Sequence, residues 1–232
     1  APRHGKPLIS KQLLKNAILL FVALIVAGSL GLVVLIGIMS SHLPNPNSLT
    51  ERTISQTTKI FDRTGTHLLY EIFGNQNRTL KKFQEGFCKD DKNFATDSNG
   101  VPLFAIQATI AAEDHNYCTH GGFDLKGMTR AVLLLGTRGG GSTLTQQLVK
   151  NAILSNEKTL TRKLKELLLS IELERRYSKD EILQIYFNEI PYGSTYYGIE
   201  AAAQNFFGKS SHDLSIAEAA TLAALPKATT TY

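Results

Sequence analysis

The sequence predicts a mainly α-helical protein with one N-terminal transmembrane helix and one small β-hairpin. Three observations support this prediction: an uncharged apolar run at 17–39, a pair of β-prone runs around residue 64, and helical spacing of apolar residues over most of 103–225. Because 43% of the 232 residues are hydrophobic and 19% are charged, the chain can form one or two modest globular domains beside a membrane segment. Composition alone indicates no function.

The apolar run at 17–39 is long enough to cross a bilayer, whose hydrocarbon core is about 30 Å thick, since a helix rises about 1.5 Å per residue. A cleaved signal peptide is the alternative, but its apolar core is usually about 7–15 residues and no small-x-small cleavage site follows Met39. Four cations precede the run, whereas no Lys or Arg follows it until Arg52. We therefore predict a membrane anchor with a cytoplasmic basic tail at 1–16 and an extracytoplasmic domain.

The positive charge of the protein lies mostly in that tail. Four of the five net positive charges belong to it, which leaves one for residues 40–232. The isoelectric point of about 9.1 therefore does not indicate a basic catalytic surface, and nucleic-acid binding is disfavoured. Cys88 and Cys118 are expected where a disulfide is permitted, but their spacing matches no metal or redox motif and leaves open whether they pair.

The rest of the chain divides into a stalk, a domain and a short end. A Pro/Asn/Ser-rich stretch within 40–56 predicts the stalk, 57–226 forms the domain, and 227–232 is either the start of a truncated linker or the C-terminus. Two β-prone runs flank a turn at 62–65 and predict the hairpin, and polar residues at 85–100 predict a surface loop. Helices are expected at 104–114, 125–135, 143–154, 159–177, 179–188, 198–207 and 216–225.

The helix expected at 159–177 is amphipathic. Four of its apolar residues recur at helical spacing and predict the stripe that faces the core: Leu164, Leu167, Leu168 and Ile171. Arg162 and Glu166 fall nearly opposite this stripe, so we expect them to face water or a cleft.

The first candidate site lies at 111–123, where a nearly all-apolar helix ends in Glu113 and Asp114. Apolar surroundings and the negative end of a helix dipole both make a carboxylate a stronger base. Glu113 is therefore a candidate general base. Taken alone, a pair of solvated carboxylates without a task is the alternative. His115 and His120 are five residues apart and do not fit a His-Glu-x-x-His zinc pattern.

The second candidate site lies at 139–151, where three glycines lead into a helix whose Thr143 and Gln146 fit a capping box. Free amides at such a helix start attract anions. A Walker-type phosphate loop is excluded, because the Gly-Lys-Ser/Thr core is missing and Lys150 lies two turns into the helix. An ordinary loop and cap beside a polar helix surface is the alternative.

The third candidate site is the run from Arg162 to Glu166, two residues that are one helical turn apart and can pair. An exposed pair of this kind contributes only about 0.3–0.5 kcal/mol, so a solvated helix face is the alternative. The three sites together are more informative than each alone, because they supply two separated carboxylates, nearby cations and an anion-binding helix start. This combination suits sugar transfer from a phosphorylated donor.

In this order the motifs resemble those of the peptidoglycan glycosyltransferases, family 51 of the glycosyltransferases. The resemblance covers roughly residues 50–226. It rests on five runs: Glu113-Asp114-x-x-Tyr117-x-x-His120-x-Gly122, Gly141-Ser142-Thr143-x-Thr145-Gln146-Gln147-x-x-Lys150-Asn151, Arg162-Lys163-x-x-Glu166, Lys179-x-x-Ile182-Leu183-x-x-Tyr186-x-Asn188 with Pro191-Tyr192-Gly193, and Gly198-Ile199-x-Ala201-Ala202 through Leu225-Pro226. The turn at 62–65 is similar to one in two-domain class A penicillin-binding proteins.

The resemblance implies that Glu113 is the general base and Glu166 a second catalytic acidic residue. It implies a lysozyme-like helical lobe and a small membrane-dipping subdomain, to which the apolar run 131–135 is a candidate contributor. Tyr117 stands where the family commonly has Phe. The substrate- and pyrophosphate-binding residues that it implies are Asp114, His120, Ser142, Thr143, Gln146, Gln147, Lys150, Asn151, Arg162 and Lys163.

The implied reaction is the polymerisation of lipid II into β-1,4-linked glycan strands by inverting transfer, with release of undecaprenyl pyrophosphate. The expected partners are lipid II, the growing glycan chain and the cytoplasmic membrane, with a cell-wall synthesis complex as a further candidate. A divalent ion, Mg²⁺ or Mn²⁺, is expected to bind with the substrate near Glu166 rather than in a protein cage.

Two alternatives remain at this point. A lysozyme-like lytic enzyme could use the same helical lobe and acidic residue to cleave peptidoglycan. A neutral glycan, however, needs no cluster like Lys150, Arg162 and Lys163, whereas a pyrophosphate leaving group does, so the charges favour synthesis. A catalytically silent membrane scaffold is the other alternative, against which the two intact glutamates argue.

Overall fold

The structure of the protein is a computed structural model that describes residues 11–41, 43–46, 49, 57–74, 76–81, 86–89, 100–127, 129, 141–154, 159–193 and 195–228. The chain forms two compact units, residues 1–43 and 44–232. Several predicted features lie partly or wholly outside the described residues: 1–10 of the tail predicted at 1–16, 90–99 of the loop predicted at 85–100, most of the helix predicted at 125–135 with its apolar run 131–135, and 229–232 of the end predicted at 227–232.

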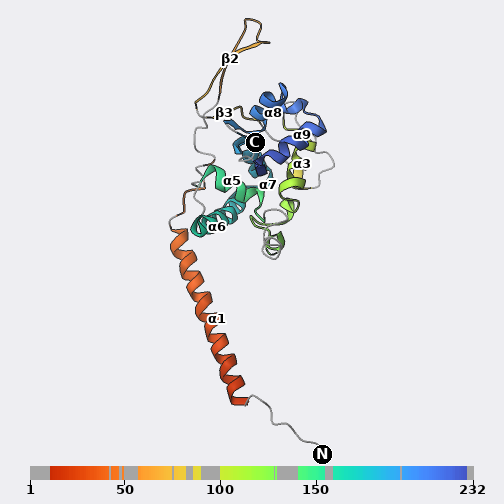
Figure 1. The fold of residues 1–232 in the computed structure, drawn as a ribbon. Helices are drawn as coiled ribbons and strands as arrows, with labels where there is room; N and C mark the ends of the chain where they lie inside the picture. Colours follow the sequence, from red (N-terminus) through yellow and green to blue (C-terminus); the bar gives the residue numbers. More distant parts are fainter. Residues whose placement is uncertain are drawn as a thin grey trace, which may run out of the picture. The chain divides into compact units, whose positions relative to one another are not determined.

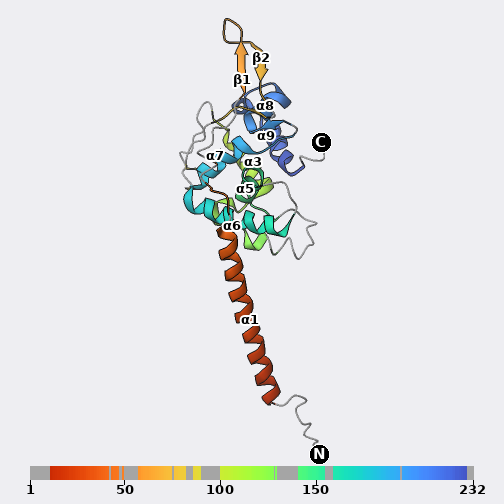
Figure 2. The same cartoon turned by 90° about the vertical axis from the view of Figure 1, so that its left-hand side faces the viewer.

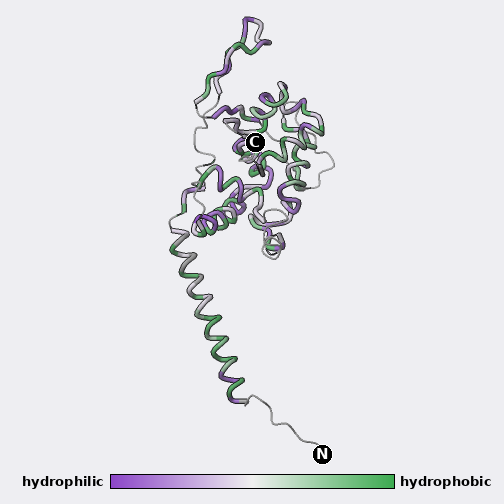
Figure 3. The backbone as a smooth tube through the Cα atoms, viewed as in Figure 1, coloured by the Kyte–Doolittle hydropathy of each residue, from purple (hydrophilic) through white to green (hydrophobic). Residues whose placement is uncertain are grey.

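The first unit contains one long helix, α1 (Lys11–Ser40), which is hydrophobic over most of its length (Figure 3). Its most apolar part, Gln12–Gly31, has a mean hydropathy of 2.2 and is long enough to cross a membrane, by length and composition. The helix begins before the predicted residue 17, because Lys11 and Lys15 are good helix formers and extend it toward the N-terminus.

The second unit is mainly helical, as predicted, and agrees with the lysozyme-like lobe that the resemblance implies (Figure 1). Six of the predicted helices are confirmed to within about two residues at each end: α3 (Leu103–Glu113), α5 (Leu144–Ala152), α6 (Leu160–Arg176), α7 (Lys179–Glu189), α8 (Ile199–Phe207) and α9 (Ile216–Ala224). Capping boxes open α5, α7 and α9, which explains why their first residues could be read from the sequence.

The core forms where these helices pack: α3 against α9, and α5 against both α6 and α7. Leu144 and Leu148 of α5 and Leu173 of α6 are fully buried there, together with Ile182 and Tyr186 of α7. Because α5 lies between α6 and α7 in this packing, it is the helix on which the polar residues of both neighbours converge.

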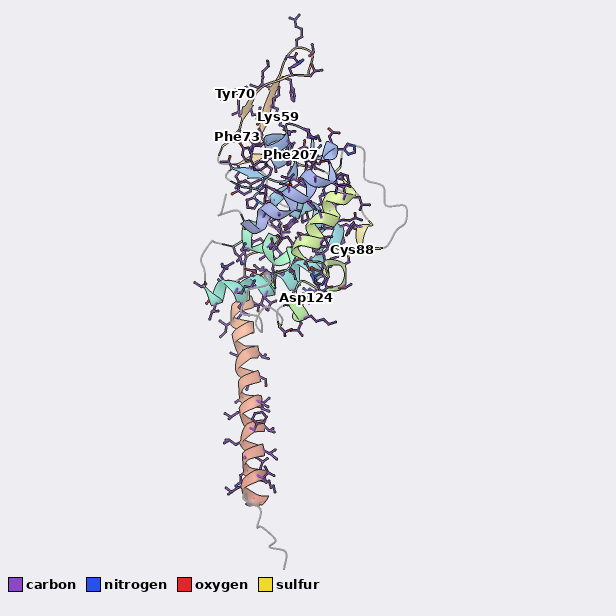
Figure 4. All side chains as sticks on the ribbon, turned by 45° about the vertical axis from the view of Figure 1, so that its right-hand side comes forward. Lys59, Tyr70, Phe73, Cys88, Asp124 and Phe207 are labelled. Atoms are coloured by element: carbon purple, nitrogen blue, oxygen red, sulfur yellow. A yellow bond between two sulfur atoms is a disulfide. The ribbon has the colours of Figure 1, made fainter. Side chains whose placement is uncertain are left out.

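The predicted hairpin is also present. Strands β1 (Thr58–Phe61) and β2 (Leu68–Ile72) pair antiparallel (Figure 2). Lys59 of β1, labelled in Figure 4, contacts Glu71 of β2 at 3.5 Å and donates to Gln204 of α8 over 2.5 Å. The hairpin is thereby fastened to the helical body.

A second small sheet was not predicted. Strand β3 (Asn77–Arg78) pairs parallel with β4 (Tyr196–Tyr197), a strand within the region expected to be purely helical. Two-residue strands are too short to show alternation in sequence. Arg78 forms a buried ion pair with Glu189 of α7 at 2.8 Å, and its guanidinium lies 5.3 Å from the ring centre of Tyr197. This ion pair joins the sheet to the core.

The predicted core stripe of α6 is wrong. The helix instead buries the opposite side, which consists of Glu166, Leu169, Ser170 and Leu173. Ile171 of the predicted stripe is 39% exposed, and Leu164, Leu167 and Leu168 are only half-buried. The buried side faces inward because it contacts other segments: Glu174 accepts from Thr145 of α5, and the backbone of Ser170 packs closely against Gly122.

We expect Glu189→Gln to destabilise the second unit by about 3–5 kcal/mol, because it leaves the buried Arg78 guanidinium without its counter-charge. Glu172→Gln is the matched control: Glu172 pairs with the exposed Arg175 and Arg176, and its loss should cost no more than about 1 kcal/mol. Urea unfolding followed by tyrosine fluorescence measures both. Equal losses of unfolding free energy in the two variants would show that the buried ion pair stabilises the unit no more than the exposed one does.

Candidate active site

The end of α3 is fastened to the start of α5 by one carboxylate. Asp114, the C-cap residue of α3, accepts from Nε2 of His120 at 2.9 Å and from the backbone N–H of Leu144 at 2.9 Å. The Leu144 amide is one of the donors that a helix start leaves without an intrahelical partner, and a negative charge is favoured there. Asp114 therefore fixes the last residue of α3 against α5.

Glu113 is that last helical residue, and its two oxygens have different surroundings. Oε2 accepts from Nε2 of Gln147 on α5 at 2.8 Å. Oε1 is buried and has no hydrogen-bond partner within the described part of the chain. Glu113 also lines a small cavity of about 50 Å³, together with His115 and Asp124, the latter labelled in Figure 4. Gln147 thus holds one oxygen of Glu113, while no described residue bonds the other.

The second candidate carboxylate, Glu166, lies on α6 and is 2% exposed. It forms ion pairs with Arg162, at 2.9 Å, and with Lys163. Lys163 also donates to the hydroxyl of Ser142, which precedes α5, over 2.7 Å. The predicted Arg162–Glu166 pair is present, but Glu166 is buried and not part of a solvated helix face.

A further cation lies on α5. Lys150 is half-buried in the last turn of the helix and forms no ion pair with another residue of the described ranges. Asn151 beside it is exposed. A half-buried ammonium without a counter-charge among the described residues favours an anionic ligand.

Four residues that the resemblance assigns to substrate binding are instead held by internal bonds. Asp114 and His120 bond each other, and both side chains are less than 9% exposed. Thr143 donates to the carbonyl of Gly122 and caps α5, while the Oε1 atom of Gln146 accepts from the backbone of Thr143. A role in substrate binding stays a prediction for these four, and their visible task is to hold α3, α5 and the intervening turn.

Gly122 is required where the chain passes α6. Its φ is +86°, and a Cβ at this position would lie 2.6 Å from the carbonyl oxygen of Ser170. No side chain fits at that distance, so glycine allows the turn after His120 to approach the backbone of α6.

A buried network of charged residues near Asp114 was not predicted from the sequence. Glu174 of α6 accepts from the hydroxyl of Thr145 at 2.6 Å and pairs with Lys179 of α7 at 2.5 Å. The Lys179 ammonium lies 4.4 Å from the ring centre of Tyr117, whose hydroxyl donates to the Lys179 carbonyl. Burial lowers the pKa of Lys179 and raises that of Tyr117 well above its ordinary value. The sequence signal for the contact between Tyr117 and Lys179 was the tyrosine itself, which stands where the family commonly has Phe.

The pairing that the sequence left open is settled by the structure. Cys88 and Cys118 form a disulfide between the short 3₁₀ turns η1 (Phe87–Lys89) and η2 (Tyr117–Thr119). Both oxygens of Asp180 at the start of α7 accept from backbone N–H groups that precede Cys88, at 2.7 and 3.2 Å. The segment that follows Glu113 is thus joined to a turn that α7 positions.

Comparisons with known proteins give a consistent result. The family model for transglycosylases matches residues 76–232. The chain belongs to the transglycosylase family. Penicillin-binding protein 1A of Aquifex aeolicus is 38% identical over 223 residues, which are 94% of this chain and 28% of that protein. Penicillin-binding protein 1A of Pseudomonas aeruginosa is 38% identical over 84% of this chain, and penicillin-binding protein 1F of Bacillus subtilis 46% identical over 58%. The chain spans about a quarter of the length of such relatives.

The described residues of the candidate site offer no set of ligands for a metal ion bound by the protein alone. Among the described residues, no group of three His, Cys, Asp or Glu side chains is placed to hold one. Glu166 already pairs with two cations. The oxygens of Asp114 already accept hydrogen bonds from His120 and from the Leu144 amide. A divalent ion in this site would therefore depend on ligands from the substrate.

Removing the disulfide with Cys88→Ser and Cys118→Ser together should destabilise the transglycosylase unit by about 3–4 kcal/mol, because the bridge joins residues 30 positions apart in sequence. Differential scanning calorimetry of the double variant against the parent measures the loss. Adding dithiothreitol should lower the melting temperature of the parent and leave that of the double variant unchanged. An unchanged parent would contradict a stabilising bridge.

Proposed function

We propose that this transglycosylase domain is an inverting peptidoglycan glycosyltransferase, which polymerises lipid II into β-1,4-linked glycan strands and releases undecaprenyl pyrophosphate. The observation that carries the proposal is the contrast between two carboxylates. Glu113 lines a small cavity and has one oxygen without a hydrogen-bond partner among the described residues, whereas Glu166 is paired with Arg162 and Lys163. A base and a cationic site for a leaving group are the two groups that such a transfer needs.

In the proposed reaction, Glu113 removes the proton from the 4-hydroxyl of the acceptor sugar. The freed oxygen electron pair forms the new bond to the anomeric carbon of the donor chain. The bond to the pyrophosphate oxygen breaks in the same step, and its electron pair leaves with undecaprenyl pyrophosphate. A single displacement inverts the anomeric centre. The proton remains on Glu113 until it returns to solvent.

The cations Lys150, Arg162 and Lys163 would bind the pyrophosphate oxygens. Lys150 is the clearest candidate, because it has no counter-charge in the described part of the chain. Arg162 and Lys163 are kept near Glu166, which holds them in place before the substrate arrives. This charge supports synthesis over lytic cleavage, since a neutral glycan offers no phosphate to bind.

The membrane and the remaining partners are part of the same proposal. Helix α1 fits an anchor, and the disulfide fits an oxidising extracytoplasmic compartment with the N-terminus in the cytoplasm. Lipid II and the growing glycan chain are the proposed substrates, and a cell-wall synthesis complex is a further proposed partner. We propose that Mg²⁺ or Mn²⁺ enters, if required, on the pyrophosphate, and no step is assigned to it.

Glu113→Gln should abolish polymerisation while the domain stays folded, because the amide cannot accept a proton. Loss of a general base lowers rates by about 10²–10⁴-fold. Incubation of the purified protein with lipid II, followed by gel separation of the glycan products, measures this. Near-parental turnover of the variant would remove Glu113 from the mechanism. Soluble fragments released by the parent from mature cell wall would favour the lytic alternative.

Lys150→Ala should lower kcat/KM by roughly 10- to 150-fold, because a charge-assisted bond to phosphate contributes about 1.5–3 kcal/mol. Lys150 is a cleaner test than Arg162, whose removal would also leave the buried Glu166 with one partner fewer. Arg175→Ala is the control, since that side chain is 74% exposed and pairs only at the surface of α6. Equal kinetics in both variants would mean that the pyrophosphate site lies elsewhere.

A further inference from the structure

Three side chains form a row that leads from α7 through α5 to the end of α3. The hydroxyl of Tyr186 lies 3.4 Å from Oε1 of Gln147, and Nε2 of the same amide donates to Oε2 of Glu113 over 2.8 Å. Oε1 of Glu113 has no partner in the described ranges. The row therefore determines which of the two glutamate oxygens is left for a substrate.

The direction of each hydrogen bond in the row follows from charge. An ionised carboxylate only accepts, so Gln147 must turn its NH₂ group toward Glu113. Its carbonyl oxygen then faces Tyr186, which must donate. Tyr186 remains protonated for this purpose, because burial, aided by the nearby Tyr192 and Glu113, raises the pKa of its hydroxyl well above the ordinary value.

Among the described residues, Gln147 is the hydrogen-bond partner of the Tyr186 hydroxyl. The side chain is fully buried and packs edge-on against Phe187, with ring centres 5.8 Å apart. A buried tyrosine hydroxyl usually has a polar partner, and Gln147 is the one that the described residues offer it. A 3.4 Å separation is long for this bond, but catalytic hydrogen bonds are often long before the substrate binds.

We propose that Tyr186, acting through Gln147, is a positioning residue that holds Glu113 with its Oε1 atom turned toward the acceptor hydroxyl. This inference rests on the proposed function. The acceptor proton passes to Oε1, while Oε2 keeps its bond to Gln147, and neither Gln147 nor Tyr186 gains or loses a proton. Gln147, expected from the resemblance to bind substrate, thereby orients the base instead.

A double-mutant cycle in the full chain, reconstituted in bilayers with lipid II, tests the inference. Tyr186→Phe should lower kcat about three- to tenfold, the range that one neutral hydrogen bond provides, with KM unchanged. Gln147→Leu should lower kcat further. When Gln147 is already replaced by Leu, Tyr186→Phe should not lower kcat any further, because the effect of Tyr186 on Glu113 passes through the Gln147 amide. Additive losses would overturn the inference.

Tyr192→Phe is the matched control, because Tyr192 is 1% exposed, is also close to Glu113, and has no hydrogen bond to Gln147 among the described residues. A loss of kcat equal to that of Tyr186→Phe would overturn the inference. If Tyr186→Phe does not fold, Gln147→Leu decides alone: a fall in kcat at unchanged KM supports orientation of the base, and a rise in KM at unchanged kcat contradicts it.

The failure of the inference can be separated from failure of the proposed function by Glu113→Gln in the same assay. Full turnover of Glu113→Gln would reject Glu113 as the base, and the positioning role would fall with it. An inactive Glu113→Gln protein combined with additive losses in the cycle would reject only the role of Tyr186.

Discussion

The geometry of the candidate site depends on the buried carboxylate of Asp114. Asp114 follows the last residue of α3 and accepts hydrogen bonds from His120 and from the first backbone N–H of α5. The end of α3, the turn after it and the start of α5, 30 residues further on, therefore meet at one group. Glu113 is its neighbour on α3, and Gln147 lies one turn beyond that amide on α5. Their contact is therefore a consequence of the Asp114 bonds. Loss of this carboxylate would leave buried donors unpaired and release the two helices from each other.

The two glutamates of the site differ because their neighbours differ. Glu166 is enclosed by two cations and by the packed side of α6, so positive charges in the protein lie directly beside its carboxylate. Glu113 accepts one hydrogen bond from a neutral amide, and its other oxygen has no partner in the part of the chain that the structure describes. The first arrangement suits a fixed charge that keeps cations in place, and the second suits a group that exchanges a proton. In the proposed reaction the same residue type would therefore supply two chemical functions.

The sequence predicted those parts of the structure that depend on neighbours along the chain. Helix bounds follow from apolar spacing and from caps such as Ser178 and Ser215, and the hairpin follows from its turn. The resemblance assigned catalytic roles to Glu113 and Glu166, and these roles stay predictions. The buried side of α6 was missed, because hydrophobicity favoured its leucines over Glu166, whose burial depends on ion pairs and on close packing at Ser170. The contact of Glu174 with Lys179 was missed as well, since both charges are placed by packing between helices.

The disulfide also affects how the protein is made. The turn that carries Cys88 is oriented by Asp180, which is synthesised 92 residues after it, so the two sulfurs reach their native relation only once α7 has formed. Oxidation of the thiols before the chain has folded would nevertheless not produce a wrong intramolecular pairing. Within these 232 residues there are two cysteines, and two cysteines allow a single intramolecular bridge. Production of this chain therefore requires an oxidant for the thiols and no isomerase to correct their pairing.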